Sequence, residues 1–171
     1  MEARKLLAPL VQRAPAAAAV RELLGLTLYR LGKWTDAIRE LEAFRSLTGS
    51  TEQHPVLADA YRAIGDSTMV RHLWDELREA SPSAELVAEG RIVMAGVLAD
   101  AEDFQSAIAL VAPAIKRVRR AQEHHLRLLY VLGDLYERAG DIPKARQLFE
   151  RVVVASPEFA DALDRRRALG S

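Results

Sequence analysis

The stretch GDLYERAGDIPKARQLFERVVVASPEF, residues 133–159, predicts two helices joined by a tight turn. Apolar residues recur at spacings of three and four on both sides of Gly140, which is the period of an α-helix. Small residues interrupt these apolar stripes at Gly133 and Ala145. Pro157 stops the second helix, because proline lacks a backbone N–H and clashes with the preceding turn. The stretch therefore predicts a helical hairpin whose two helices cross closely at small side chains.

The same order of residue types recurs three more times along the chain. In the quoted hairpin the small residue Gly133 is followed by the large Tyr136 after three positions and by Gly140 after seven. A second small residue, Ala145, follows after twelve positions, and the large apolar Phe149 follows after sixteen. The counterparts start at Gly25, Ala58 and Ala95, and successive markers lie 33, 37 and 38 residues apart. Such self-similarity indicates an array of stacked hairpins, because one hairpin cannot bury its apolar face alone.

This pattern resembles the tetratricopeptide-repeat (TPR) family, whose unit is a helix–turn–helix of about 34 residues. The match is nearly complete from Gly133 to Pro157 and weakest from Met94 to Arg119, and the copies span nearly the whole chain. The resemblance implies an all-α fold, a right-handed α-solenoid of antiparallel helix hairpins with about ten helices. It also implies a single domain, residues 1–171, made of a half repeat (1–15), four repeats (17–50, 51–84, 85–121 and 122–158) and a C-terminal capping helix (159–171).

Departures from the family pattern make further predictions. The third repeat carries extra residues on both sides, which predicts longer helices there, and Glu102 replaces the glycine of its turn. Pro9 and Pro113 lie at equivalent places inside second helices and are expected to kink them. The final helix is expected to turn its polar residues to solvent, and these are Asp161, Asp164, Arg165 and Arg166.

The composition limits the classes of function. Lys plus Arg and Asp plus Glu both number 24, so the net charge is zero, whereas nucleic-acid binders usually carry a basic excess. The absence of cysteine excludes disulfides, Cys-ligated zinc and thiol nucleophiles, and we expect a reducing cytoplasm. The excess of Arg over Lys, together with abundant Ala, indicates a GC-rich bacterial genome. The apolar run Leu6–Val11 is too short for a secretory signal, and no stretch reaches the ~20 apolar residues of a membrane span.

No motif for catalysis or for a cofactor emerges. The stretch Gly25–Trp34 superficially resembles a phosphate-binding loop, but six residues rather than four separate its glycines, and neither Ser nor Thr follows Lys33. His124 and His125 are sequence neighbours and point about 100° apart on a helix, which does not suit a shared metal. The pair His72–Glu76 has helical i,i+4 spacing without an evident third ligand. We therefore expect a non-enzymatic protein with no cofactor and no metal site.

Two other functions stay open at this stage. The basic run Lys116–Arg127 favours a regulatory module that binds nucleic acid or another polyanion, or else a solvated helix whose arginine stems cover apolar neighbours. The half repeat at residues 1–15 lacks its first helix. Either Met1 begins a trimmed chain, or a second copy covers that face in a homo-oligomer such as a homodimer.

The family resemblance also implies where a partner protein would bind. In TPR proteins the first helices line a concave groove, and the implied function is a scaffold or adaptor that binds a peptide or helix of a partner there. We expect Tyr130 to serve partner binding and to contribute little to packing between repeats. The expected groove residues are Glu22, Leu26, Tyr29, Arg30, Asp59, Arg62, Ile92, Asp100, Tyr130, Asp134, Glu137 and Arg138, and the remaining equivalent positions are Pro55, Ala63, Gly96 and Ala99.

One TPR subfamily binds the acidic C-terminal tails of heat-shock chaperones through Lys, Asn and Arg at set groove positions. This chain has none of those types at the matching places, which hold Glu22, Leu26, Val56, Glu89 and Val93. That function is therefore rejected, and the expected partner is a different protein or peptide.

Overall fold

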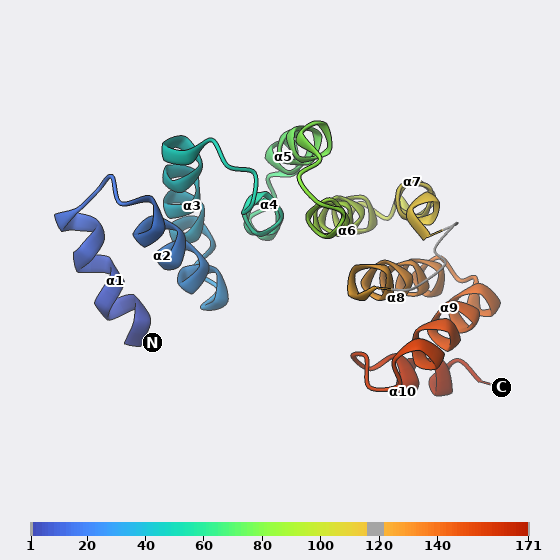
Figure 1. Cartoon of the computed structure of the whole chain (residues 1–171). Coiled ribbons are helices and arrows are strands. Elements are labelled where there is room, and N and C mark those ends of the chain that lie inside the picture. Colours follow the sequence, from blue (N-terminus) through green and yellow to red (C-terminus); the bar gives the residue numbers. More distant parts are fainter. Residues whose placement is uncertain (1, 116–121, 171) are drawn as a thin grey trace. The chain divides into compact units, whose positions relative to one another are not determined.

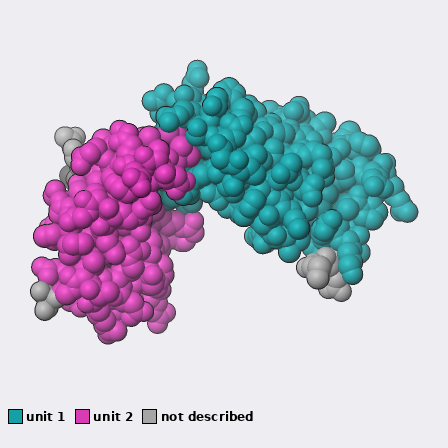
Figure 2. All heavy atoms as spheres, turned by 180° about the vertical axis from the view of Figure 1, so that it is seen from behind, with its two compact units in different colours: residues 1–93 teal, residues 94–171 magenta. Residues whose placement is uncertain are grey.

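A computed structural model describes residues 2–115 and 122–170 of the chain. Ten α-helices and one 3-10 helix account for its regular structure, and these described residues contain no β-strand. The helices form two compact units, Met1–Val93 and Met94–Ser171, which are coloured teal and magenta in Figure 2. None of the helices in the described ranges is both long enough and apolar enough to cross a membrane.

Unit 1 is built from helical hairpins. Helix α2 pairs with α3 and α4 pairs with α5, while α1 packs on α2 and α3 packs on α4 (Figure 1). The helices are α1 (Glu2–Arg13), α2 (Ala18–Arg30), α3 (Trp34–Thr48), α4 (His54–Ala63), α5 (Ser67–Ala80) and the first part of α6 (Ala84–Asp100).

Unit 2 repeats the same arrangement around a second hairpin. Helix α8 pairs with α9, α7 packs on α8, and the short α10 packs on α9 (Figure 1). The elements are the last part of α6, α7 (Phe104–Val111), the 3-10 helix η1 (Ala112–Ile115), α8 (Glu123–Arg138), α9 (Ile142–Ala155) and α10 (Ala162–Ala168). The chain is thus an α-solenoid of antiparallel hairpins, as the sequence predicts.

The small residues lie where the paired helices cross. A Cβ atom built on Gly25 of α2 would lie 2.7 Å from the Leu41 side chain of α3, and one on Gly133 of α8 would lie 3.0 Å from the Phe149 ring of α9. Ala145 on the facing side of α9 is completely buried. Since an added methyl group at Gly25 would require Leu41 to move, the predicted close crossing of the helices is confirmed.

The turns inside the hairpins use the left-handed backbone conformation. Gly32, Gly65 and Gly140 have φ angles of 68°, 83° and 82°, as expected for residues that end a helix in this way. Glu102 occupies the equivalent place in the third repeat and adopts φ 59° without being glycine. The turn geometry is therefore kept even where its usual residue is missing, at a cost in backbone strain.

Aspartate residues follow three of these turns and cap the second helices. Asp66, Asp103 and Asp141 each accept a hydrogen bond from the backbone N–H three residues further on. This bond satisfies one of the helix N–H groups that lack an intrahelical partner. Lys33 takes the equivalent place before α3 and provides no such bond.

Prolines mark the ends of second helices, as predicted. Helices α1, α5 and α9 each end two residues before a proline, which is Pro15, Pro82 or Pro157. Pro9 lies inside α1. Pro113 does not kink a long helix, because α7 ends at Val111 and the backbone continues as the 3-10 helix.

The third repeat confirms one half of the length prediction and contradicts the other. Helix α6 has 17 residues and is longer than α2 or α4, as expected. Helix α7 has only 8 residues, so the predicted longer second helix is wrong. Proline at 113 has no N–H to continue the α-helical pattern, and the backbone after Val111 forms the 3-10 helix instead.

A further close approach was not predicted. Gly90 on α6 lies directly against the side chains of Trp74 and Leu77 on α5, with no room for a Cβ atom. The Arg91 guanidinium lies over the Trp74 ring, 5.4 Å from its centre. Gly90 therefore allows a close approach of α6 to the side chains of α5.

Candidate functional site

The predicted surface residues of unit 1 meet where α2 faces α4. The Tyr29 hydroxyl on α2 donates a hydrogen bond to Asp59 Oδ2 on α4 at 2.6 Å. Burial and this hydrogen bond to a carboxylate together raise the pKa of Tyr29 to about 12. The Tyr29 ring also packs edge-on against Trp34, with 5.4 Å between ring centres. Tyr29 and Asp59 therefore fix two successive first helices to each other.

The other predicted residues of unit 1 differ in their contacts and exposure. Glu22 accepts a hydrogen bond from Gln53 at 2.8 Å, and Arg62 lies 3.6 Å from the Asp59 carboxylate. Leu26 and Ile92 are half-buried, while Arg30 is exposed in the last turn of α2. The additional position Pro55 is buried at the start of α4 and does not contribute to a surface, which corrects its assignment.

The predicted residues of unit 2 meet α10 and the residue before it. The Tyr130 hydroxyl on α8 donates to Asp161 Oδ1, the residue before α10, at 2.5 Å. The Tyr130 ring packs against Phe149 and Phe159, with ring centres 5.5 and 6.1 Å apart. The expectation that Tyr130 contributes little to packing is therefore wrong, because its ring and hydroxyl both hold α10 in place.

Arg165 of α10 gathers three of the predicted α8 groups. Its guanidinium donates to Asp134 at 2.9 Å, to Glu137 at 2.7 Å and to the Tyr130 oxygen at 3.2 Å. Burial alone would lower the pKa of Arg165, but the hydrogen bonds to these groups outweigh burial and raise it. Only 23% of the Arg165 side chain is exposed, so its predicted solvent-facing position is wrong.

The last two predicted residues lie at the C-terminal ends of α8 and α6. Arg138 donates to the backbone carbonyl of Ala99 at 3.0 Å, and its guanidinium lies 5.1 Å from the centre of the Phe104 ring. Asp100 is exposed at the end of α6. Ala99 itself is buried, so this additional position does not belong to a surface either.

Three residues that complete these contacts were missed by the sequence analysis: Gln53, Asp161 and Arg165. A spacing signal for Asp161 was present, because it follows Tyr130 by 31 positions as Gln53 follows Glu22, and both Asp161 and Gln53 directly precede a helix. Extending the repeat spacing beyond Phe159 would have identified α10 as the counterpart of a first helix. The signal for Gln53 was weaker, since it precedes α4 and has no repeat marker of its own.

A second polar cluster joins α3, α4 and α5 of unit 1. Glu76 accepts from the Arg45 guanidinium at 2.6 Å and lies 2.9 Å from the buried His54 and 3.2 Å from His72. Burial lowers the pKa of His54 although the Glu76 carboxylate opposes this effect. Burial would raise the pKa of Glu76, but its hydrogen bond to His54 and the charge of Arg45 lower it. His54 is therefore a neutral hydrogen-bond donor inside the fold.

The cation Arg45 makes this cluster a poor place for a metal ion. Within residues 2–115 and 122–170, no group of three or more His, Asp or Glu side chains is arranged to hold one. The basic run Lys116–Arg127 lies partly outside the described residues, at 116–121. In its described part, Arg127 pairs with Glu123 of the same helix at 2.8 Å.

These features define a helical-repeat protein that offers hydroxyl, carboxylate and guanidinium groups along its first helices. Two sequence-family models match the chain, at residues 1–55 and 87–153, and both describe the tetratricopeptide repeat. The chain belongs to the tetratricopeptide-repeat family. No curated protein matches it.

Solved structures with the same fold cover most of the chain. A thermophilic TPR protein of Thermus thermophilus has a TM-score of 0.73 at 18% identity, covering 97% of this chain and 88% of that one. YrrB, a TPR protein with an unusual peptide-binding site, has a TM-score of 0.60 at 15% identity, covering 96% and 81%. MamA of Desulfovibrio magneticus RS-1 has a TM-score of 0.61 at 16% identity, covering 89% and 88%. At these identities the likeness shows the fold.

Proposed function

We propose that the protein is a non-catalytic scaffold that binds a peptide or helix of a partner protein through the first-helix surface. In unit 1 this surface comprises Leu26, Tyr29 and Arg30 of α2 with Asp59 and Arg62 of α4. In unit 2 the equivalent groups lie on α8. The TPR fold generally serves protein–protein interaction, and the peptide-binding site of YrrB supports a peptide as the class of ligand.

The observation that carries the proposal is the fixed polar arrangement around Tyr29. Its bond to Asp59 orders both side chains before any partner arrives, so less conformational entropy is lost on binding. Asp59 and Arg62 keep 32% and 33% of their side chains exposed, which leaves hydrogen-bonding capacity for a peptide backbone or side chain. Leu26 and the exposed Arg30 lie on the same helix as Tyr29 and add an apolar and a charged contact.

Peptides selected from a displayed random library on the wild-type protein test this proposal. Arg30→Ala and Arg62→Ala are expected to weaken the selected peptides about tenfold each, since arginine is a frequent interface anchor. Arg71→Ala is the matched control, because Arg71 is an exposed arginine on the second helix α5. Isothermal titration gives the dissociation constants, and circular dichroism checks folding. Peptides that lose affinity with Arg71→Ala but not with Arg30→Ala or Arg62→Ala would exclude this surface.

Self-association is a second candidate, supported by one observation. Leu6 and Leu10 lie four residues apart on one face of α1, and they are 69% and 45% exposed. A second copy that covered this face would remove both leucines from water. Leu6→Glu and Leu10→Glu should then shift the mass measured by light scattering to that of a single chain. A wild-type protein that already scatters as one chain at high concentration excludes this candidate.

A further inference from the structure

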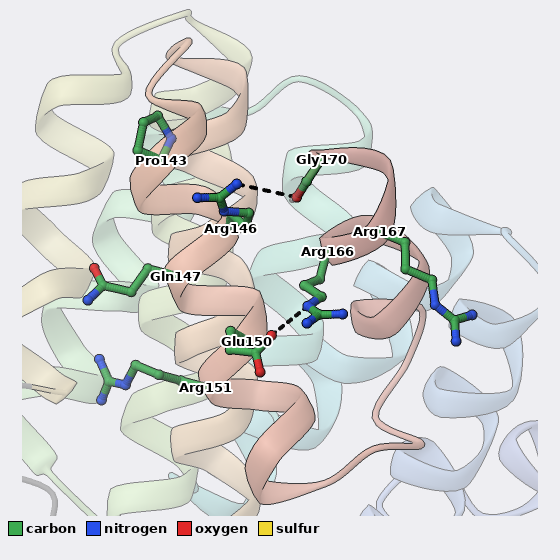
Figure 3. A pocket seen from close by; sticks show the side chains of 8 residues that line it. All are labelled: Pro143, Arg146, Gln147, Glu150, Arg151, Arg166, Arg167 and Gly170. Atoms are coloured by element: carbon green, nitrogen blue, oxygen red, sulfur yellow. Dashed lines mark hydrogen bonds and ion pairs between the residues drawn. The ribbon is translucent and has the colours of Figure 1, made fainter.

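A pocket of about 740 Å³ lies between α9 and α10 of unit 2, away from the first-helix surface of α8 (Figure 3). Its walls come from one side of α9 and from the end of α10. Four arginines and one glutamate line it, together with Pro143, Gln147 and Gly170. This is an unusual concentration of positive charge in a chain whose net charge is zero. The charged lining residues are Arg146, Glu150, Arg151, Arg166 and Arg167.

Most of this positive charge is not neutralised inside the pocket. Glu150 is paired with Arg166 at 2.5 Å, as the dashed line in Figure 3 marks. Arg146 donates to the neutral carbonyl of Gly170 at 3.4 Å and therefore keeps its full charge. Arg151 forms no ion pair within the parts of the chain that the structure describes. The pocket thus contains more guanidinium groups than carboxylates.

Arg167 adds a further cation at the rim. Its nearest carboxylate is that of Asp164, 3.7 Å away on the same helix, and both side chains are mostly exposed. Such a pair is weak in water and leaves the guanidinium available to another anion. Arginine binds carboxylates and phosphates through two parallel N–H groups, so a pocket with several arginines selects oxyanions.

The remaining lining groups favour carboxylates carried on a peptide. Gln147 can both donate to a peptide carbonyl and accept from a peptide N–H, whereas most oxygens of a phosphate ion can only accept. Glu150 repels a compact polyanion placed beside it, but carboxylates spaced along a peptide can avoid it. The size of the pocket is also that of a ligand larger than one phosphate. We propose that this arginine pocket binds an acidic segment of a protein partner, at a site separate from the first-helix surface.

The test uses the whole chain and a short fluorescein-labelled peptide of alternating aspartate and glycine. Binding is followed by fluorescence anisotropy at low salt. The double variant Arg146→Gln/Arg151→Gln is expected to bind the peptide at least about tenfold more weakly, because two charge-assisted contacts are lost. The control Arg4→Gln/Arg71→Gln removes the same charge from exposed positions of unit 1 and should leave binding unchanged. Equal weakening by both double variants would show general attraction and overturn the proposal.

Two further arms identify the ligand and the surface. The same peptide with asparagine in place of aspartate should not bind, and tripolyphosphate should compete poorly. Wild-type protein that binds tripolyphosphate but not the aspartate peptide would overturn the assignment to a protein segment. Arg62→Ala should leave the aspartate peptide unaffected, which separates this pocket from the first-helix surface of unit 1. Loss of aspartate-peptide binding in Arg62→Ala alone would place the acidic ligand on that surface instead.

Discussion

Helices α4 and α10 hold the same kind of position in the two units, but they are held by different forces. Each follows a hairpin and receives a hydrogen bond from a tyrosine of that hairpin, Tyr29 to Asp59 and Tyr130 to Asp161. Helix α4 has 10 residues and buries several side chains, including Leu57. Helix α10 has 7 residues and buries only Ala162 among them. The charged hydrogen bonds from Arg165 to Asp134 and Glu137 therefore stabilise the position of α10, which has few apolar contacts of its own.

The difference shows how one junction can be stabilised in two ways. Burying a leucine side chain contributes about 2 kcal/mol, and this contribution is not screened by salt. A guanidinium that bonds several partly exposed carboxylates contributes less and is screened by ions. Helix α4, which packs against α3 and α5, can use the first means, whereas α10, which packs on α9, depends more on the second.

The largest expected effect concerns α4. Leu57→Ala should lower the free energy of unfolding by about 2–4 kcal/mol, because Leu57 is only 1% exposed and its truncation leaves a cavity. Urea unfolding followed by circular dichroism measures this change. Leu47→Ala is the control, since Leu47 is 47% exposed, and it should stay within about 0.5 kcal/mol. A loss at Leu57 no greater than that at Leu47 would mean that apolar burial does not hold α4.

The next effect concerns α10. Arg165→Ala should cost about 1–2 kcal/mol, because it removes charged hydrogen bonds to Asp134 and Glu137, whose side chains are about a third exposed. Hydrogen exchange should become faster in the amides of α10 and remain slow in those of α4. Higher salt should have the same selective effect on the wild-type protein.

Arg167→Ala is the matched control on the same helix, because Arg167 is 65% exposed and pairs only loosely with Asp164. It should leave exchange in α10 nearly unchanged. If Arg167→Ala loosens α10 as much as Arg165→Ala does, charge pairing by Arg165 is not what distinguishes the two junctions.

A smaller effect should be shared by both junctions. Tyr29→Phe removes a hydroxyl that donates to a carboxylate and should cost about 1 kcal/mol, and Tyr130→Phe, which also removes the acceptor of an Arg165 hydrogen bond, should cost somewhat more. The aromatic packing of both rings is kept in the phenylalanine variants, so the measured loss reports the hydrogen bond. Urea unfolding provides the comparison. Costs that differ severalfold between the two variants would show that the junctions share a geometry but not its energy.

The smallest effect is a pH dependence of unit 1 that centres on His54 and Glu76. The pKa of His54 in the folded protein lies below its ordinary value of 6.5. On acidification, His54 is therefore protonated in the unfolded chain before it is protonated in the folded chain. Stability should therefore begin to fall as the pH drops below about 6.5. The pKa of Glu76 is also lowered, from its ordinary 4.5, so a second loss follows below that pH.

His54→Gln should remove the first loss and keep the second, because glutamine can still donate to Glu76 but does not titrate. Hydrogen exchange of α4 and α8 at pH 7 and pH 5.5 provides the measurement. Exchange that accelerates equally in both helices of the wild-type protein, and also in His54→Gln, would refute the assignment of this pH dependence to His54.

The repeat pattern predicted the hairpins because each residue type that recurs in it meets a requirement of the backbone or of packing at that one position. Gly140 is needed for a left-handed backbone, Gly133 for a close crossing, and Pro157 for the end of a helix. These requirements act on single residues and are visible in the sequence. The same logic explains why Glu102 was placed in a turn although it is not glycine, since the surrounding markers fixed the register.

The pattern failed where a distant partner decides the outcome. Arg165 looks like any exposed arginine of a helix until Asp134 and Glu137 are brought beside it by packing. Likewise, the extra residues after Val111 could have lengthened α7, but the proline at 113 turned the backbone into a 3-10 helix instead. For the first-helix surface, the sequence identified residues that the structure places together within each unit, and their role in binding a partner stays a prediction.

The match between α10 and a first helix has a consequence for engineering. Because Asp161 precedes α10 and meets Tyr130 as Gln53 precedes α4 and meets Glu22, a duplicated segment 122–158 inserted ahead of α10 would present a new tyrosine to the same aspartate. The array could be lengthened one unit at a time while α10 and Arg165 are kept as a common terminator. Helix α10 could also be grafted onto another array of hairpins. The first helix of that array's last hairpin would need only a tyrosine and two carboxylates, at the spacing of Tyr130, Asp134 and Glu137.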